Sequence, residues 1–290
     1  MWTEFIDLLI PAIVFGSQVA LMSLGFAVSY WPSREINFAI GGVYATAAYV
    51  MWWLNVEEHQ PIELAILASL ALTLVLQMVI RELVYRSLRR EALVFLASFA
   101  VYILLENLLQ LLFSPNPQSM PLGSWTYHEY KLLGPFQASL PDLLNIGLAV
   151  LSLVSVWMFL HHTRIGRASR AVISDPGLAL CAGIRPRRIA TSCYLIGGVI
   201  VLIAAVLASY QYGLTPSMGT NPVFYALNAT LVGGRGNVLG AAYAGMLIGI
   251  VSELSILFFP SEWTMAVAFG VLFIMIVFRP NGIFKSMAWS

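Results

Sequence analysis

Arginines recur in one polar stretch of an otherwise apolar chain. Arg164, Arg167 and Arg170 follow one another at three-residue spacing, with small or apolar residues between them. Asp175 is followed by a proline, so the pair supplies a helix cap and a first helical residue, and Gly183 is suited to end that helix. The pattern predicts one short helix on a membrane face, with its arginines available to another protein. The other interpretation is that these cations only orient the chain and attract anionic lipid.

Histidines and nucleophiles do not gather into a catalytic or metal-binding set. His161 and His162 precede the arginines, but no carboxylate or further histidine stands near them to complete a metal site. No convergent nucleophile and base is recognisable, which makes an intramembrane enzyme the weakest of the functional classes. We expect no catalytic residue and no metal ligand.

Two carboxylates fall inside long apolar runs. Glu106, beside Asn107, and Glu253 each carry a charge that costs about 2.5 kcal/mol or more at the centre of a membrane. They must therefore face protein, water or the interface. One interpretation is a polar lining for a cavity that opens outward, and the other is hydrogen bonding between helices or an acid at the interface.

The composition indicates an all-α integral membrane protein. Of 290 residues, 59% are hydrophobic and 10% are charged, which leaves too little polar surface for a soluble globule. A membrane-spanning helix needs roughly 20 apolar residues. Eight stretches approach that length, at residues 5–30, 36–54, 62–85, 93–113, 143–160, 189–210, 238–258 and 263–278. We expect one transmembrane domain over residues 1–290.

The basic residues predict the orientation of these spans. Arg34, the arginines of residues 81–90, those of the loop at 161–188, and Arg279 with Lys285 all fall on one side if the N-terminus is outside. Lys131 is the exception, and it falls in the long outer loop at 114–141. That loop contains five prolines, and we expect either a small cap that meets a delivering protein or a plain connection between helices.

Eight spans alone would leave both termini on one side, so a further segment must cross. Residues 222–237 hold about ten apolar residues followed by the glycine-rich Gly233, Gly234, Arg235 and Gly236. They predict a short broken helix of the kind found at transport pathways. The alternative is a surface loop whose apolar run packs on the outer rim.

Four motifs in register resemble one known family. The stretch TRIGRASRAVISDPGLALCAGIRPRRI from Thr163 resembles the cytoplasmic loop of permease subunits of branched-chain amino-acid ABC transporters. Three others agree in order and spacing: Ile36 to Ala39 with Gly41, GGRGNVLGAAYAGMLIG from Gly233, and FRPNGIF from Phe278. The resemblance covers nearly the whole chain.

The resemblance implies a subunit of an importer in a bacterial inner membrane. It would pair with a second permease, sit on two cytoplasmic ATPase subunits and receive solute from a periplasmic binding protein, with lipid around it and no nucleic acid. The chain has no phosphate-binding loop, so ATP and Mg would be bound by the partner subunits. The matched loop would hold the coupling helix, with ATPase-coupling residues Arg164, Gly166, Arg167, Arg170, Asp175, Gly183 and Ile184.

The solute is less well defined by the resemblance. Ile40, Gly41 and Gly42 stand where relatives commonly have His-Gly-Glu. The candidate solutes are therefore branched-chain or related amino acids and, as alternatives, urea, short amides and aromatic acids. The residues expected along the pathway are Asn37, Phe38, Gly41, Glu106, Asn107, Gly233, Gly234, Gly236 and Glu253. The small residues from Gly233 to Gly249 primarily predict close packing of helices, and a role of the Gly233 to Gly236 turn in lining the pathway is the second interpretation. A rival class is an ion-coupled secondary transporter or channel that uses Glu106 or Glu253.

Overall fold

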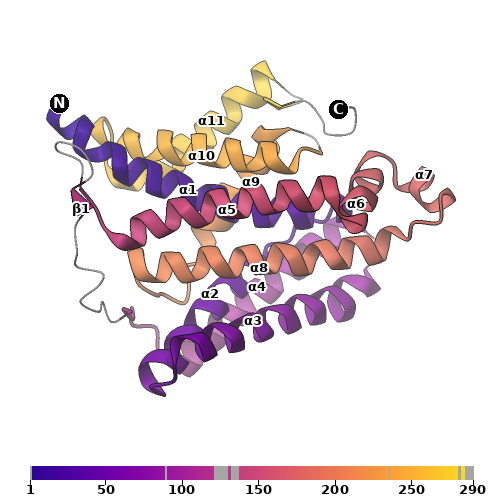
Figure 1. Ribbon diagram of the computed structural model, residues 1–290, viewed down its shortest axis with the longest axis horizontal. Coiled ribbons are helices and arrows are strands. Elements are labelled where there is room, and N and C mark those ends of the chain that lie inside the picture. Colours follow the sequence, from indigo (N-terminus) through magenta and orange to yellow (C-terminus); the bar gives the residue numbers. More distant parts are fainter. Residues whose placement is uncertain are drawn as a thin grey trace.

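The chain forms a bundle of long helices that run between two ends of the molecule (Figure 1). A computed structural model describes residues 2–88, 90–120, 130–131, 137–234, 236–279 and 282–284. Arg89, Arg235 and Lys285, the middle of the loop predicted at 114–141, and two residues of the FRPNGIF motif lie outside those ranges.

Seven helices of the described part are long and apolar enough to cross a membrane. They are built on α1 (Trp2–Ser33), α3 (Ile62–Val79), α4 (Glu91–Phe113), α5 (Leu140–His162), α8 (Pro186–Tyr212), α10 (Val238–Leu254) and α11 (Thr264–Phe278). Single turns of π or 3-10 helix extend α3 to Ser87 and α10 to Leu257. Each of the seven coincides with a predicted span, and the all-α membrane class is confirmed.

Two shorter helices complete the bundle. The span expected at 36–54 becomes α2 (Ala39–Trp52), followed by a π turn, Trp53–Glu57. It begins late because residues 34–38 form a connection in which Arg34 has a φ of 58°. The segment expected as a broken helix is α9 (Thr220–Gly233), a continuous helix that begins two residues early and ends before residues 234, 236 and 237. With α2 and α9 added to the seven long helices, the described part of the chain has an odd number of helices in the bundle. An odd number is what the prediction of termini on opposite sides of the membrane requires.

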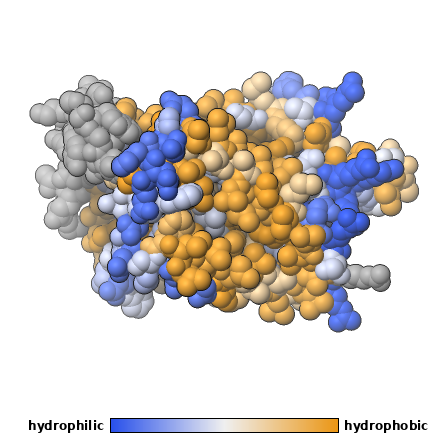
Figure 2. Space-filling model, turned by 90° about the horizontal axis from the view of Figure 1, so that it is seen from below, coloured by the Kyte–Doolittle hydropathy of each residue, from blue (hydrophilic) through white to orange (hydrophobic). Residues whose placement is uncertain are grey.

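The helices divide into a buried centre and an apolar periphery. Every residue of α2 except Val50 is buried, because α3, α4, α8 and α9 surround it. Helices α3, α4 and α5 bury less than a third of their most apolar stretch, and α11 buries Ala268. Their exposed leucines and phenylalanines form a hydrophobic belt between two hydrophilic ends (Figure 2). That belt is the surface expected to meet lipid.

Glycines let α1 and α10 pack backbone to backbone. A Cβ atom on Gly249 would lie 2.6 Å from the Cα atom of Gly16, and one on Gly245 would lie 2.6 Å from Oγ of Ser23. No larger side chain fits at either position without a shift of the helices. The packing role predicted for the small residues near the C-terminus is therefore confirmed for these two.

Short elements lie at both ends of the bundle. At one end are α6 (Arg164–Ser174) and α7 (Pro176–Cys181), which project beyond the long helices (Figure 1). In the outer loop a two-stranded antiparallel ladder joins β1 (Tyr130–Lys131) to β2 (Gln137–Ala138). Gln118, earlier in that loop, pairs with Leu214 through two backbone hydrogen bonds of 2.8 and 2.9 Å. These bonds fix the connection between α8 and α9.

Candidate functional site: a basic loop at one end and a cavity at the other

The arginine-rich stretch that follows α5 contains two helices where the sequence predicted one. The first, α6, begins because the hydroxyl of Thr163 accepts a hydrogen bond of 2.9 Å from the amide of Gly166. A Cβ atom on Gly166 would lie 2.0 Å from the carbonyl oxygen of Phe159, so a larger residue would force α6 away from the end of α5. The prediction of one helix was wrong because it overlooked this second cap.

The second helix, α7, starts and stops where the sequence predicts. Oδ1 of Asp175 accepts hydrogen bonds from the amides of Gly177 and Leu178, at 2.7 and 3.0 Å. Gly183 follows the helix with a φ of +79°, a left-handed conformation that glycine adopts without strain. The amide of Ile184 then donates to the carbonyl of Ala179 at 3.0 Å, which closes the end of α7.

The two short helices present different surfaces to solvent. On α6, Gly166, Ser169 and Val172 are buried at three-residue spacing against the bundle, and Arg164 and Arg167 point outward. On α7 the leucines Leu178 and Leu180 are 69% and 61% exposed. Exposed leucines beside arginines, outside the hydrophobic belt, are typical of a protein-docking surface. We call α6 and α7 together the basic loop.

A cavity of about 410 Å³ opens at the other end of α8. Its volume falls within the range of roughly 300–1,000 Å³ that is usual for small-molecule sites. Residues of α1, α2, α8, α9, α10 and α11 line it together with the connection fixed by Gln118. Its apolar lining includes Phe15, Val19, Met22, Ala208, Met218 and Ile256, and its polar lining includes Gln18, Tyr44, Tyr212, Asn221, Tyr225 and Glu253. We call it the outer cavity, after the side on which the predicted orientation would place it.

Gln18 is held in place by hydrogen bonds in the lining of the outer cavity. Its amide nitrogen donates to the hydroxyl of Tyr44 at 3.2 Å and to the carbonyl of Ala204 at 2.6 Å. Its carbonyl oxygen is buried without a hydrogen-bond partner among the described residues. A buried acceptor without a partner is costly, which sets this oxygen apart from the amide nitrogen of the same side chain.

Glu253 is the residue of the predicted pathway that lines the outer cavity. It lies in the last turn of α10, half-buried, and no arginine or lysine is among the lining residues. A carboxylate in such a cavity favours a cationic group on a ligand. The second carboxylate, Glu106, lies on α4 next to Tyr102, whose hydroxyl hydrogen-bonds to Thr220 of α9. Asn107 is exposed and bonds to the carbonyl of Ile103 in its own helix.

The predicted pathway residues near the second span lie in the packed interior. Oδ1 of Asn37 accepts a hydrogen bond of 2.6 Å from the hydroxyl of Tyr85. The ring of Phe38 makes edge contacts with Phe95, Phe99 and Phe224. Gly41 allows α2 to cross α9, since a Cβ atom there would lie 2.8 Å from the carbonyl oxygen of Gly219. These three positions hold α2 against its neighbours.

The predicted glycine turn joins three segments. A Cβ atom on Gly233 would lie 2.5 Å from the amide of Ala241, so α9 and α10 meet there. Gly234 and Gly236 have φ values of 109° and 74°. The amide of Ile283 donates to the carbonyl of Val232 at 2.9 Å, which docks the C-terminal tail on the turn. None of the three glycines lines the outer cavity.

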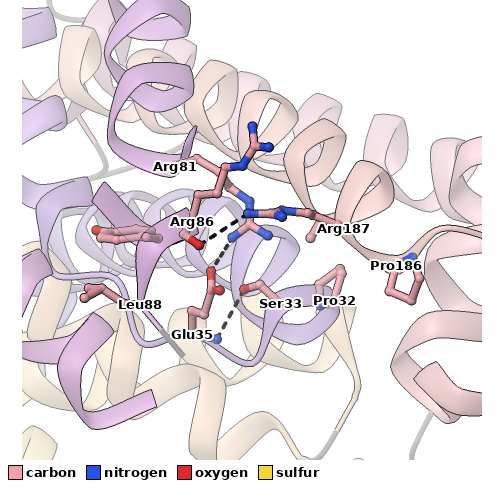
Figure 3. A pocket seen from close by; sticks show the side chains of 10 residues that line it. Pro32, Ser33, Glu35, Arg81, Arg86, Leu88, Pro186 and Arg187 are labelled. Atoms are coloured by element: carbon pink, nitrogen blue, oxygen red, sulfur yellow. Dashed lines mark hydrogen bonds and ion pairs between the residues drawn. The ribbon is translucent and has the colours of Figure 1, made fainter. Parts of the chain in front are cut away.

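A network of charges ties the helices together at the end near the basic loop (Figure 3). Arg81 of α3's extension forms an ion pair with Glu35, in the connection between α1 and α2. Tyr194 of α8 donates to the same carboxylate at 3.1 Å, and the Arg81 guanidinium lies 4.5 Å from the centre of its ring. Glu82 accepts a hydrogen bond of 3.2 Å from Thr191.

The sequence analysis missed both Gln18 and Glu35. Each left a signal: Gln18 is an amide inside an apolar run, and Glu35 is an acid in a loop assigned to the basic side. Arg81 was counted as an orientation charge alone. His161 packs on the ring of Trp157 and bonds to its carbonyl oxygen at 2.9 Å.

Known proteins of similar sequence are transport permeases. The chain is 27% identical to BraD, a permease protein of a high-affinity branched-chain amino acid transport system of Pseudomonas aeruginosa, over 97% of this chain and 95% of that protein. It is 25% identical to the corresponding LivH protein of Escherichia coli, over 96% and 95%. A permease protein of an autoinducer 2 import system, LsrD of Escherichia coli, is 27% identical over about half of each chain, 52% and 51%.

The fold and a family model agree with these relatives. PsaBC from Streptococcus pneumoniae, solved in complex with a Fab, has a TM-score of 0.57 with 13% identity, over 97% of both chains, which is a likeness of fold. The family model described as branched-chain amino acid transport system / permease component matches residues 8–276. The chain therefore belongs to the permease component family of branched-chain amino acid transport systems.

Proposed function

We propose that the chain carries a branched-chain amino acid across a bacterial inner membrane as one of two permease subunits of an ATP-driven importer. Family membership already makes it a transport subunit rather than an enzyme. The observation that supports the specific proposal is the pairing of an amino-acid-sized cavity at one end with an exposed basic docking surface at the other. Residues 1–290 then act as one transmembrane domain.

The outer cavity suits a solute that is part aliphatic and part charged. Its apolar wall can take a branched side chain, and Glu253 can accept from an ammonium group. Urea and short amides would leave the apolar wall empty, and aromatic acids bring no ammonium group to Glu253. The two relatives that cover nearly the whole chain are named for branched-chain amino acids.

The basic loop is proposed as the contact with the ATPase subunits. Thr163 and Asp175 cap its helices, and Gly166 and Gly183 set where each one begins or ends, so the docking surface is rigid. Since α8 starts beside this loop and ends at the outer cavity, a movement of the loop reaches the cavity through one helix. With 27 residues, α8 spans about 40 Å.

The proposed assembly follows from these two surfaces. A second permease completes the pathway, two ATPase subunits bind ATP and Mg, and a periplasmic binding protein delivers solute to the outer cavity. The N-terminus then lies outside and the C-terminus inside. In this assembly the loop at 114–141 lies beside the delivering protein, because Gln118 holds the segment that lines the cavity.

The proposal is tested by measuring solute uptake in cells from which the gene for this chain has been deleted, with and without a plasmid that restores the chain. We expect uptake of leucine, isoleucine and valine that stops when ATP is depleted and persists when a protonophore abolishes the proton gradient. Uptake of urea, or of an aromatic acid without an ammonium group, in place of leucine would contradict the proposed solute. Uptake that survives without ATPase subunits and follows an ion gradient would instead support a secondary transporter that uses Glu106 or Glu253.

A further inference from the structure

We propose that a second cavity, beside the basic loop, binds the phosphate of an anionic membrane phospholipid. This cavity measures about 340 Å³ and lies between the end of α1, the extension of α3 and the start of α8 (Figure 3). Its lining residues include Glu35, Arg81, Arg86, Pro186 and Arg187. We call it the arginine cavity.

The arginine cavity carries an excess of positive charge. Three arginines and one glutamate line it, and Figure 3 shows the arginine side chains gathered on one side of Glu35. Arg81 pairs with Glu35, and Arg86 pairs loosely with Glu82 at 3.4 Å. In the described part of the chain no carboxylate pairs with Arg187, which donates only to the carbonyl of Arg86 at 3.5 Å. An anion would supply the missing partner.

An unpartnered donor and a helix start add to the positive character of the arginine cavity. Arg81 is 8% exposed, and its Nε atom is buried without a hydrogen-bond acceptor among the described residues. The long helix α8 begins here with Pro186 in its first turn, so the positive end of its dipole adds to the arginine charges. A phosphate has enough oxygens to accept from several of these donors at once.

The surroundings favour a lipid phosphate over a free anion. The arginine cavity lies at the end of the bundle that bears the basic loop, at the end of α1, the extension of α3 and the start of α8. The surface of α3 and its extension that leads to it exposes Val75, Val79 and Leu83, at 56%, 41% and 73%. These apolar residues recur at four-residue spacing, so they form one strip along which acyl chains can lie. Basic pockets between membrane helices bind lipid head groups for this reason.

Native mass spectrometry of the purified transporter complex, with phosphatidylglycerol as the probe, tests the proposal. We expect the complex to retain phosphatidylglycerol, and the variant Arg187→Gln to bind it about fivefold more weakly. Arg188→Gln is the matched control, because Arg188 is the next residue, is exposed, carries the same charge and does not line the cavity. Size-exclusion profiles of both variants establish that each still assembles.

Each other outcome overturns the proposal. Equal retention by the wild type and Arg187→Gln would remove the arginine cavity as the site. Equal loss in Arg187→Gln and Arg188→Gln would indicate general surface attraction. In nanodiscs of phosphatidylcholine, inorganic phosphate that raises the melting temperature as much as phosphatidylglycerol does would assign the cavity to a free anion. Displacement of the lipid when ATPase subunits bind would assign it to that interface.

Discussion

The two ends of the molecule differ in how their polar groups are used. Near the basic loop, Arg81 pairs with Glu35 and Tyr194 donates to the same carboxylate, and these contacts hold three segments of the chain together. At the other end, Gln18 and Glu253 face a cavity, and the Gln18 oxygen has no hydrogen-bond partner among the described residues. Ionic contacts between helices therefore dominate at the end near the basic loop, and polar groups that face the proposed solute cavity dominate at the other end.

This difference indicates that the two ends of the same helices have different roles, one in stability and coupling and the other in solute recognition. Helices α1 and α8 reach both ends, so a change in the ion network or the basic loop can be transmitted to the outer cavity through rigid helices. Groups at the end near the basic loop should affect stability and coupling, and groups at the outer cavity should affect the recognition of solute. Four substitutions test that separation, from the largest expected effect to the smallest.

Removal of the buried cation should destabilise the end near the basic loop. The variant Arg81→Gln leaves the charge of Glu35 without its partner, and we expect the free energy of unfolding to fall by about 3 kcal/mol. Denaturant unfolding in detergent measures this. The matched change Arg86→Gln removes an exposed pair, with the arginine side chain 63% exposed, and should cost less than about 1 kcal/mol. Equal losses would show that the network does not tie this end.

Loss of the cavity carboxylate should alter recognition and leave stability unchanged. In Glu253→Gln the ammonium group of a solute loses a charged acceptor, which is worth about 2 kcal/mol, so the KM for leucine uptake should rise about thirtyfold. Glu262→Gln is the control, since Glu262 is exposed nearby and does not line the outer cavity. An unchanged KM in Glu253→Gln would remove Glu253 from the pathway.

The turn after α7 should affect coupling without affecting recognition. Gly183→Val places a branched residue at a φ of +79°, a strain of about 1–2 kcal/mol, although a Cβ atom there would meet no other atom. We expect ATP hydrolysis to lose its stimulation by loaded binding protein, with a roughly tenfold loss of uptake and normal insertion. Gly183→Asn should keep coupling within about twofold, because asparagine tolerates this conformation. Normal coupled uptake in Gly183→Val would count against α7 as the docking helix.

The smallest effect is expected at the carboxylate outside the cavity. Glu106 lies on α4 beside Tyr102 and does not line the outer cavity, so Glu106→Gln should change the KM for leucine by less than about twofold. The same uptake assay checks this beside Glu253→Gln. A change as large as that of Glu253→Gln would mean that the pathway follows α4 instead.

Hydropathy and charge predicted the parts of the fold that depend on local sequence. The long spans were found because each one is a run of apolar residues, and α7 was found because Asp175 and Gly183 act on their own neighbours. The short α9 was predicted because eight spans would leave both termini on the same side of the membrane, and not because of its length. The start of α6 was missed, although Thr163 is a cap residue, because the contact between Gly166 and Phe159 joins two helices.

The site depends on contacts between residues far apart in the sequence. Gln18 meets the carbonyl of Ala204, 186 residues away, and Glu35 meets Arg81, 46 residues away. No local pattern contains those pairs. Motif matches marked Asn37 and Gly233 as special, but in the structure both positions hold helices together rather than line the outer cavity. The sequence thus identified constrained positions without separating packing from recognition.

The central claim is that the basic loop faces the cytoplasm and binds an ATPase, and the chain's own cysteines test it. Cys181, at the end of α7, is exposed, and Cys193, on α8, is buried. A photoreactive maleimide at Cys181 of the assembled transporter should cross-link to the ATPase subunit, and a membrane-impermeant maleimide should not label Cys181 on intact cells. Labelling of Cys181 from outside, or its cross-linking to the solute-binding protein, would contradict the account.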